Sequence, residues 1–358
     1  MGGMMKVLMA MSGGVDSSVA AKLLCDEGYE CIGCTMKLYD NCDAGLPRGR
    51  TCCSLDDVED ARSVAFSLGM RYYVFNFKDD FREKVIKKFA SGYLRGQTPN
   101  PCIDCNRYMK FDKLFERAKL LGCDKIATGH YARIEFDGRK YRLKKALDKS
   151  KDQSYVLYML TQEQLAHALF PLGSLHKTDT RAIADTADLS SAHKPDSQDI
   201  CFVPDGDYAA AIERLAGIKA PCGNFIDASG KVIGTHRGIT HYTVGQHRGL
   251  GLSLPERRYV CSIDAENSTV TLGGSDELYS STAEVRGFNW ISGETPAEPI
   301  RCTAKIRYRQ PEQPATAIAH KDGSITIQFD APQRAVTPGQ AAVLYDGDTV
   351  LGGGEIVR

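Results

Sequence analysis

The residues with the clearest chemical potential form a short glycine-containing segment near the N-terminus, Ser12-Gly13-Gly14-Val15-Asp16-Ser17. It follows the strand-like run 6–10 and precedes apolar residues at helical spacing. Backbone N–H groups, two glycines and the positive end of a helix therefore meet at one point, which favours an anion. The segment lacks the Gly-Lys-[Ser/Thr] of the P-loop and the Gly-x-Gly-x-x-Gly of dinucleotide folds, which argues against γ-phosphate transfer and hydride chemistry.

Cysteines are the second group of residues that could do chemistry. The chain has 13 of them, an odd number spread over a long sequence, so we expect reduced thiols rather than a secreted disulfide framework. Two sites stand out, the Cys-x-x-Cys pair Cys102/Cys105 and the single Cys201. Pro99 and Pro101 predict an extended, exposed loop over 98–101 beside the first site. Cys42, Cys52 and Cys53 are a weaker candidate for a metal site, because no histidine lies near them.

The elements that must position these residues alternate between strand and helix patterns in the first part of the chain. Strands are predicted at 6–10, 72–77 and 125–128, and helices at 55–68, 79–94 and 110–121. This alternation predicts a parallel sheet covered by helices, so we expect a doubly wound α/β domain over 1–204. Ligands of such sheets bind at the carboxyl ends of the strands, where the glycine-containing segment lies.

The character of the sequence changes after this region. Residues 205–276 contain one helical pattern, at 208–215, and glycine-rich or alternating segments, which predicts a small mixed α/β domain. Residues 277–358 alternate strictly and turn on Asp-Gly pairs at 321–323 and 346–348, which predicts an antiparallel β-barrel. A length of 358 residues agrees with two or three domains.

Composition excludes several classes of protein. With 42% hydrophobic and 25% charged residues the chain is neither disordered, collagenous nor a simple coiled coil. No run approaches the about 18 apolar residues of a membrane-spanning helix, and the N-terminus lacks the features of a signal peptide, so we expect a cytoplasmic protein with no membrane partner. The 45 basic and 45 acidic residues balance, so any surface for nucleic acid must be local. Two basic stripes are candidates: Arg301, Lys305, Arg307 and Arg309 on one face of a predicted strand, and Arg139, Lys140, Arg142, Lys144 and Lys145.

The glycine-containing segment resembles the PP-loop of the ATP pyrophosphatase superfamily, whose members release pyrophosphate and transfer AMP to a substrate oxygen. The resemblance implies ATP and Mg²⁺, with Asp16 helping to place the ion or the loop. It also implies that Met36 and Gly129 contact the nucleoside. The implied ATP-binding residues are Ala10, Met11, Ser12, Gly13, Gly14, Val15, Asp16, Ser17, Met36 and Gly129.

Further motifs follow in order along nearly the whole chain, and together they are similar to the tRNA-specific 2-thiouridylase family. The resemblance implies that the wobble uridine (position 34) of tRNA is adenylated at its C2 oxygen and then receives sulfur from a persulfide, giving 2-thiouridine, AMP and pyrophosphate. The motifs are Thr-Cys-Cys-Ser-Leu-Asp-Asp (51–57), Thr-Pro-Asn-Pro-x-x-x-Cys-Asn (98–106), Ala-Thr-Gly-His-Tyr (127–131), Lys-Asp-Gln-Ser-Tyr (151–155), Ser-Gln-Asp-Ile-Cys-Phe (197–202), Tyr-Thr-Val-Gly-Gln (242–246) and Arg-Tyr-Arg-Gln (307–310).

The same resemblance implies roles for single residues and for partners. Cys201 would carry the persulfide, and Cys105 would be the nucleophile that releases the sulfur by forming a reversible Cys105–Cys201 disulfide. A cysteine desulfurase or a sulfur-relay protein would supply the sulfur, and the anticodon stem-loop would be bound. Asn100, Pro101 and Cys102 would lie against the target base, and Lys151, Asp152, Gln153, Arg307 and Tyr308 would contact tRNA.

Cys102 departs from the family pattern, because many members carry an acidic residue at this position. Either Cys102 is a bystander or auxiliary thiol, or Cys102, Cys105 and Cys201 bind a [4Fe–4S] cluster, for which three thiolates with a Cys-x-x-Cys pair are suitable ligands. Two further alternatives are a small-molecule PP-loop amidotransferase or ligase, which needs no cysteine pair, and an iron–sulfur or zinc protein that binds tRNA without chemistry.

Overall fold

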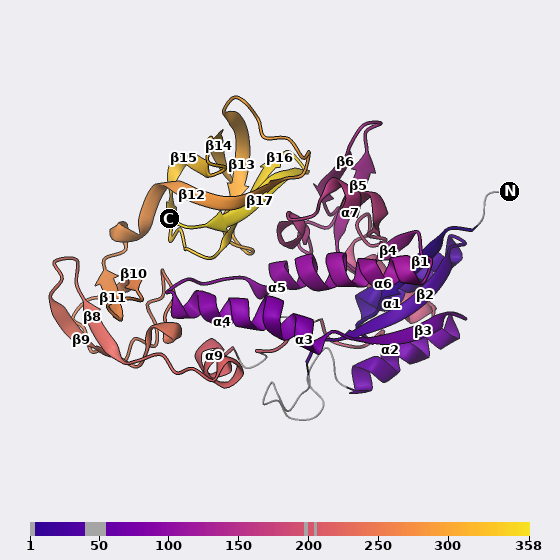
Figure 1. Ribbon diagram of the computed structural model, residues 1–358, viewed down its shortest axis with the longest axis horizontal. Coiled ribbons are helices and arrows are strands. Elements are labelled where there is room, and N and C mark those ends of the chain that lie inside the picture. Colours follow the sequence, from indigo (N-terminus) through magenta and orange to yellow (C-terminus); the bar gives the residue numbers. More distant parts are fainter. Residues whose placement is uncertain (1–3, 40–54, 197–199, 204–205) are drawn as a thin grey trace.

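The computed structural model describes residues 4–39, 55–196, 200–203 and 206–358, which form three units (Figure 1). The first unit contains a five-stranded parallel sheet with strand order β3-β2-β1-β4-β7. Because β1 lies in the middle and the chain winds outward on both sides of it, the predicted doubly wound α/β domain is confirmed. The strands are β1 (Lys6–Ala10), β2 (Glu30–Lys37), β3 (Arg71–Asn76), β4 (Lys125–Ala127) and β7 (Ala168–Leu169).

Helices cover both faces of this sheet, as a buried parallel sheet requires. Val7 and Met9 of β1 pack in a hydrophobic cluster with α1, α2 and α8, whereas Leu8 packs in a second cluster with α6. The period of two along the strand therefore divides the core into two layers. The helices are α1 (Val15–Asp26), α2 (Leu55–Ser67), α3 (Lys78–Phe81), η1 (Arg82–Ile86), α4 (Lys87–Leu94), α6 (Leu114–Leu120), α7 (Gln162–His167) and α8 (Lys177–Thr186).

The segment that carries Cys102 and Cys105 differs from its prediction. The helix expected from about residue 110 begins at Pro101 with α5 (Pro101–Asp104) and continues through the π-helical η2 (Cys105–Lys113) into α6. Proline restricts the residue before it but is favoured at the first position of a helix, and the Asn100 side chain caps the helix by accepting from the Cys102 backbone N–H at 3.0 Å. The prediction of an extended loop was therefore wrong at Pro101, and both cysteines lie in a helix.

The central unit combines helix α9 (Tyr208–Ala216) with a four-stranded sheet of order β10-β11-β8-β9. In this sheet β8 and β11 are parallel and the other pairs are antiparallel, which gives the predicted mixed α/β unit. The strands are β8 (Gly223–Ile226), β9 (Val232–His236), β10 (Tyr259–Asp264) and β11 (Thr269–Gly273).

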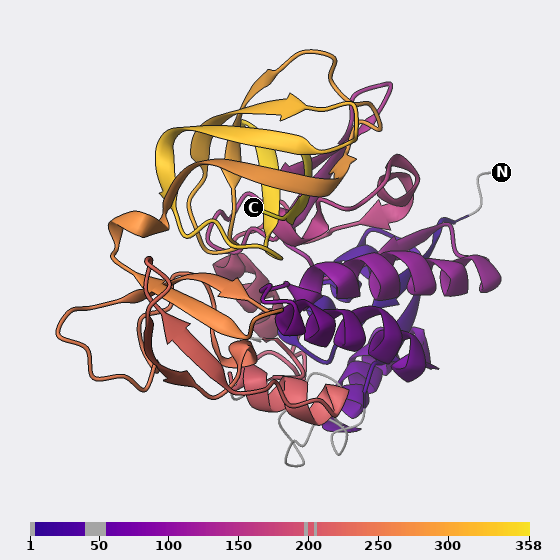
Figure 2. The same ribbon diagram turned by 60° about the vertical axis from the view of Figure 1, so that its left-hand side comes forward.

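The C-terminal unit is the predicted antiparallel barrel, and pairing of β12 with β17 closes it (Figure 2). A hairpin from the first unit, β5 (Ala132–Phe136) and β6 (Tyr141–Lys145), joins the barrel where Lys144 pairs with Thr349. No helix within the described ranges has the length and apolar character to cross a bilayer. The barrel strands are β12 (Tyr279–Trp290), β13 (Ile300–Lys305), β14 (Gln313–Ala319), β15 (Ile325–Arg334), β16 (Ala341–Asp346) and β17 (Thr349–Ile356).

Candidate active site

The glycine-containing segment forms the turn between β1 and α1, as the sequence predicts. Gly14 has extended backbone at the N-cap of α1, and the hydroxyls of Ser17 and Ser18 each donate to its carbonyl at 3.0 Å. The Ser12 backbone N–H donates to the Ser17 hydroxyl at 3.1 Å. These local hydrogen bonds fix the loop in front of the first amides of α1, which is the arrangement that binds phosphate groups at helix N-termini.

Two glycines allow other segments to approach this loop closely. Gly13 has a φ of +76°, and a Cβ there would lie 2.4 Å from the Asp57 carbonyl oxygen. Gly129 follows β4, and a Cβ there would lie 2.9 Å from the Ser17 backbone nitrogen. Both positions therefore require glycine. The structure brings Gly129 to the loop, as the resemblance implies, and Met36 lies near the carboxyl end of β2, which is hydrogen-bonded to β1.

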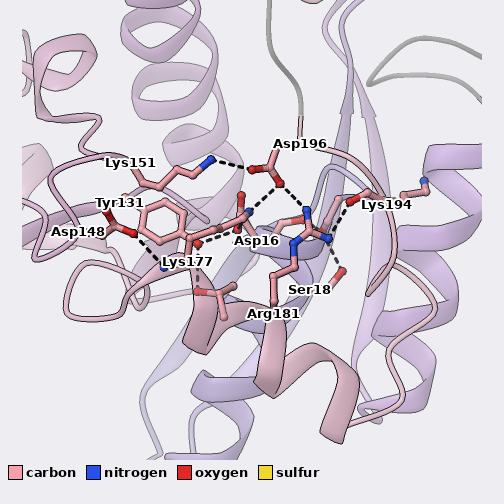
Figure 3. A network of polar contacts seen from close by, with 12 residues as sticks. Asp16, Ser18, Tyr131, Asp148, Lys151, Lys177, Arg181, Lys194 and Asp196 are labelled. Atoms are coloured by element: carbon pink, nitrogen blue, oxygen red, sulfur yellow. Dashed lines mark hydrogen bonds and ion pairs between the residues drawn. The ribbon is translucent and has the colours of Figure 1, made fainter. Parts of the chain in front are cut away.

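A network of ion pairs surrounds the loop (Figure 3). The Asp16 carboxylate accepts from the Lys177 ammonium at 2.6 Å and from the Tyr131 hydroxyl at 2.8 Å. Lys177 also lies 2.9 Å from Asp196, which pairs with Lys151 at 2.8 Å and with Arg181 at 2.6 Å. Burial alone would raise the pKa of Asp196, but hydrogen bonds and charge from Lys151 and Lys177 outweigh it and lower the pKa to about 2. Asp196 is therefore ionised at neutral pH.

The network extends to a second group of charges. Lys194 pairs with Asp57 at 2.8 Å and also with Asp60. Arg181 donates to the carbonyl oxygens of Ala192 and Lys194 at 2.7 and 2.8 Å. The sequence analysis did not identify Lys177, Arg181, Lys194 or Asp196 as site residues, because these partners come from separate segments and share no local spacing.

The two predicted catalytic cysteines lie against one hydrophobic cluster. Cys105 of η2 and Cys201 both pack on it, and both are partly buried. The Tyr39 hydroxyl donates to the Cys201 carbonyl at 2.8 Å. The cluster consists of Leu38, Tyr39, Phe77, Phe81, Val85, Ile86, Phe89, Ala90, Tyr93, Met109, Phe202, Val203, Ala211 and Ile212. Both cysteines are thiols here, so the Cys105–Cys201 disulfide that the resemblance implies is absent from this arrangement.

The electrostatic surroundings of Cys105 come from its own helix. Burial raises the pKa of the Cys105 thiol, the positive charge of Lys110 lowers it, and the negative charge of Asp104 raises it. Lys110 lies one turn further along η2, and its ammonium is 3.3 Å from His130 Nε2. An ammonium can only donate, so Nε2 accepts and the proton on Nδ1 is donated to the Thr128 hydroxyl at 2.6 Å. Burial, and then Lys110, lower the pKa of His130, so the imidazole is neutral.

Asp104 does not supply the acid that Cys102 replaces. Its side chain is 7% exposed and pairs with Lys88 at 2.7 Å. Burial raises the pKa of Asp104, while Lys88 opposes this shift. The carboxylate is therefore committed to a helix–helix contact, whereas Cys102 is exposed at the start of the helix. No group of three His, Cys, Asp or Glu side chains in the described part of the chain, these cysteines included, is arranged to hold a metal ion. Cys42, Cys52 and Cys53 lie outside the described residues.

The segment before Cys102 touches all three units. The Thr98 backbone N–H donates to the Pro338 carbonyl of the barrel unit at 2.8 Å. The Thr98 hydroxyl lies 3.4 Å from the Thr243 hydroxyl of the central unit. Asn100 and Pro101, which the resemblance places against the target base, therefore follow directly on a point where the units meet.

Of the residues implied in tRNA binding, Tyr308 lies near the start of the helix that carries Cys102 and Cys105. Its ring centroid is 5.8 Å from that of Tyr155, and the Lys305 ammonium lies 5.7 Å from the Tyr308 ring. The Tyr308 hydroxyl is 3.5 Å from the Asp152 carbonyl oxygen, to which it can donate. Burial raises the pKa of Tyr308, and the negative charge of Asp152 adds to the shift. A Cys102 thiolate would raise this pKa further, so the three residues lie in one region. An aromatic ring that is 37% exposed in this position can stack on a base.

The other implied tRNA contacts use their side chains within the fold. The Asp152 carboxylate accepts from the Ala146 N–H at 2.9 Å, and the side-chain amide oxygen Oε1 of Gln153 accepts from the Tyr131 N–H at 3.0 Å. Lys151 pairs with Asp196. Arg307 donates to Val244, Ala335 and Thr337 at 3.0, 3.2 and 2.6 Å, so it ties the central unit to the barrel.

Neither predicted basic stripe is an unpaired cationic face. Strand β13 ends at Lys305, so Arg307 and Arg309 lie in the following turn and not on the face that bears Arg301. Four of the five residues of the second stripe pair with acids, some on the same hairpin and some distant in sequence, which composition cannot reveal. Its pairs are Lys140–Glu294, Arg142–Asp137, Lys144–Glu135, Lys144–Asp348 and Lys145–Glu312, while Arg301 pairs with Asp330.

Comparison with known proteins adds independent findings. Three family models match: a tRNA methyl transferase HUP domain at 5–205, a tRNA methyl transferase PRC-barrel domain at 215–274 and an aminomethyltransferase β-barrel domain at 280–356. The chain is 52% identical over 355 residues to the tRNA-specific 2-thiouridylase MnmA of Acetivibrio thermocellus, covering 98% of this chain and 99% of that protein. It is 48% identical to the MnmA of Clostridioides difficile, covering 99% and 98%.

Among solved structures, one distant match is to a protein that binds RNA. A 4-thiouridine synthetase in complex with RNA and ATP is 20% identical, with a TM-score of 0.37, and the match covers 59% of this chain and 50% of that one.

Proposed function

This chain belongs to the MnmA family of tRNA-specific 2-thiouridylases, and from that premise we propose that it is an ATP-dependent sulfurtransferase acting on the wobble uridine, position 34, of tRNA. The observation that carries the proposal is the convergence at one sheet edge. Met36 packs on the same hydrophobic cluster as Cys105 and Cys201, and its strand is paired with the strand that leads into the phosphate loop. A nucleotide on the loop and a nucleophilic sulfur can therefore reach one substrate.

The first step of the proposed reaction is adenylation. The uridine C2 oxygen attacks the α-phosphate of ATP, pyrophosphate leaves, and C2 becomes susceptible to a nucleophile. Ser12, Gly13, Gly14 and Ser17 bind the phosphates, with Ala10, Met11, Val15, Met36 and Gly129 completing the nucleotide site. Mg²⁺ prefers oxygen ligands, so the Asp16 carboxylate fits it, and the bound ion would neutralise part of the triphosphate charge.

The second step transfers sulfur. The terminal sulfur of a Cys201 persulfide attacks C2 and AMP leaves, which joins the substrate to Cys201 through a disulfide bond. The Cys105 thiolate then attacks the Cys201 sulfur, so that 2-thiouridine is released and a Cys105–Cys201 disulfide forms. A reductant restores both thiols, and a cysteine desulfurase or sulfur-relay protein reloads Cys201. The apolar cluster around both thiols supports this route, because it excludes water from the activated intermediate.

The substrate lies between the nucleotide and the cysteines in this proposal. Tyr308 stacks on the anticodon loop, and Asn100, Pro101 and Cys102 lie against the extruded base, which is accessible in a single-stranded loop. Lys151, Asp152, Gln153 and Arg307 then contribute through the backbone and through the shape of the surface, since their side chains are used in internal contacts.

The cluster alternative is less well supported. A [4Fe–4S] cluster on Cys102, Cys105 and Cys201 needs three thiolates around one point, and these residues do not form such a group in the described structure. The family models carry the description methyl transferase, but two thiols against one apolar cluster, at the sheet edge that bears the phosphate loop, support sulfur transfer.

The experiment that tests the proposal measures the product directly. Protein purified without oxygen, with its iron content determined, is incubated with ATP, Mg²⁺, a persulfide donor and unmodified tRNA, and the digested tRNA is searched for 2-thiouridine by mass spectrometry. We expect the product to depend on ATP and on Cys201, and to form in iron-free protein. Release of AMP without any thionucleoside, or activity only in iron-loaded protein, would contradict the persulfide route.

A further inference from the structure

We propose that Lys177 binds the β- and γ-phosphates of ATP, and hence the pyrophosphate product, and that Asp196 competes with these phosphates for it. The inference rests on the proposed function, since it assumes that the loop holds ATP. It assigns a role to residues that lie outside the phosphate loop and outside every motif that led to the family.

The position of Lys177 carries the proposal. Lys177 is the first residue of α8, and its ammonium lies 2.6 Å from the carboxylate of Asp16. Asp16 is itself in the first turn of α1, directly after the phosphate loop. A phosphate oxygen bound by the amides of this turn lies within a few ångströms of that ammonium, because Asp16 and the amides share the same helix end. Figure 3 shows Lys177 directed at Asp16 from the neighbouring helix.

The surroundings of Lys177 hold its ammonium in place. The side chain is only 13% exposed, so solvent screens its charge weakly. The ammonium lies 5.8 Å from the ring of Tyr131, and the backbone N–H of Lys177 donates to the Asp148 carboxylate at 3.0 Å. A partly buried and preorganised cation loses little conformational entropy when it pairs with an anion, which favours tight binding.

The charge balance at Asp196 favours an additional anion. Three cationic side chains, Lys177, Lys151 and Arg181, pair with Asp196. Lys177 also pairs with Asp16, so in this group three positive charges face two carboxylates. A triphosphate carries more negative charge than a carboxylate, and its oxygens are strong acceptors for ammonium groups. ATP can therefore draw Lys177 away from Asp196, while Arg181 and Lys151 keep Asp196 neutralised.

The test compares nucleotides that differ only in the phosphates that Lys177 is proposed to bind. Binding of ATP, AMP and inorganic pyrophosphate, each with Mg²⁺ and without tRNA, is measured by isothermal titration calorimetry for the wild type and for Lys177→Met. We expect Lys177→Met to weaken ATP and pyrophosphate binding at least tenfold and to change AMP binding less than twofold. Retained AMP binding also demonstrates that the variant is folded.

Lys144→Met is the matched control, because Lys144 is 17% exposed and also pairs with two carboxylates, those of Glu135 and Asp348, but lies at the hairpin beside the barrel. It should bind all three ligands as the wild type does. Asp196→Asn should bind ATP about threefold more tightly, since the competing charge is removed. If Lys177→Met binds ATP as tightly as the wild type, or loses ATP and AMP binding in parallel, Lys177 does not have the proposed role. If Asp196→Asn binds ATP more weakly than the wild type, Asp196 does not compete with the phosphates. A wild type that binds no ATP would instead refute the proposed function.

Discussion

Two regions at the same edge of the parallel sheet have opposite characters: the charged end, which is the phosphate loop with the ion pairs around Asp16, and the thiol end, which is the surroundings of Cys105 and Cys201. Around Asp16 the side chains are charged and bind one another through ion pairs from several segments. Around Cys105 and Cys201 they are apolar, and aromatic rings such as Phe81, Phe89 and Phe202 pack edge to face. In the proposed reaction, one edge would therefore offer charge to the leaving pyrophosphate and an apolar surface to the sulfur nucleophile, so the two steps would take place in different environments.

The largest effect that would sharpen this comparison is expected from Cys105→Ser. Serine keeps the shape but removes the thiol, so thiolation should fall by roughly a thousandfold or more, while ATP binding at the charged end stays unchanged. Product formation by mass spectrometry and ATP binding by calorimetry measure the two ends separately. Cys222→Ser, at an exposed cysteine of the central unit, is the control. Substantial thiolation by Cys105→Ser would remove the thiol end from the reaction.

The next largest effect concerns the charged end alone. Gly13→Ala places a methyl group 2.4 Å from the Asp57 carbonyl oxygen and forces a positive φ on alanine. ATP binding should weaken by roughly 10- to 100-fold, while alkylation of Cys105 is unaffected. Gly138→Ala is the control, since Gly138 has a φ of +94° and nothing within 4 Å of the added carbon. Equal ATP binding in both variants would show that the loop does not hold the nucleotide.

A smaller effect is expected where charge does reach the thiol end. Lys110→Met removes the cation that lowers the pKa of Cys105, so the pKa should rise and alkylation by iodoacetamide near pH 7.5 should slow by about three- to tenfold. The rate at high pH, where the thiol is fully ionised, should not change. Lys113→Met is the control, because Lys113 lies on the same π-helix but pairs with Asp80 and Glu116. If the alkylation rate of Lys110→Met depends on pH as that of the wild type does, Lys110 does not lower the pKa of Cys105.

The smallest effect is a dependence of stability on pH at the charged end. The pKa of Asp196 is lowered to about 2 in the folded protein, so its stabilising contribution is present above its ordinary pKa near 4 and is lost as the pH falls toward 2. Between pH 5 and pH 3 urea unfolding should show Asp196→Asn losing about 1 kcal/mol less stability than the wild type. Asp330→Asn, at an exposed pair with Arg301, should change this slope less, because solvent screens the pair. Parallel pH profiles for wild type and Asp196→Asn would contradict the ion-pair network.

The same contrast explains what could be predicted from the sequence. The phosphate loop is contiguous over residues 12–17, and its strand and helix flank it directly, so local patterns suffice. The barrel hairpins are also local, because Asp-Gly turns mark them. Lys177 and Asp196 could not be predicted as site residues, because their roles follow from tertiary contacts with Asp16 and Lys151.

Other errors have identifiable physical causes. Proline favours extended backbone in the residue before it but is itself suited to the first position of a helix. The extended pattern predicted over 98–101 therefore holds for Asn100 and ends at Pro101, where the helix begins. The π-helical stretch from Cys105 cannot be read from side-chain periodicity, although it decides which residues face one another. The ion pairs of the second basic stripe could not be predicted, because acids such as Asp348 and Glu312 approach it only in the folded chain.

The hairpin β5–β6 has a consequence for how the chain is made. Arg133 of this hairpin pairs with Asp348, which lies 215 residues later in the sequence. On the ribosome the hairpin emerges long before its barrel partners are synthesised. The first unit can then already fold while the edge of β6 that later pairs with β17 has no partner strand. Docking of the barrel strands onto that edge then joins segments that are far apart in the sequence. The surface around Tyr308 lies among these strands, so it forms only after they have been synthesised, and the RNA-binding surface proposed there arises late in folding.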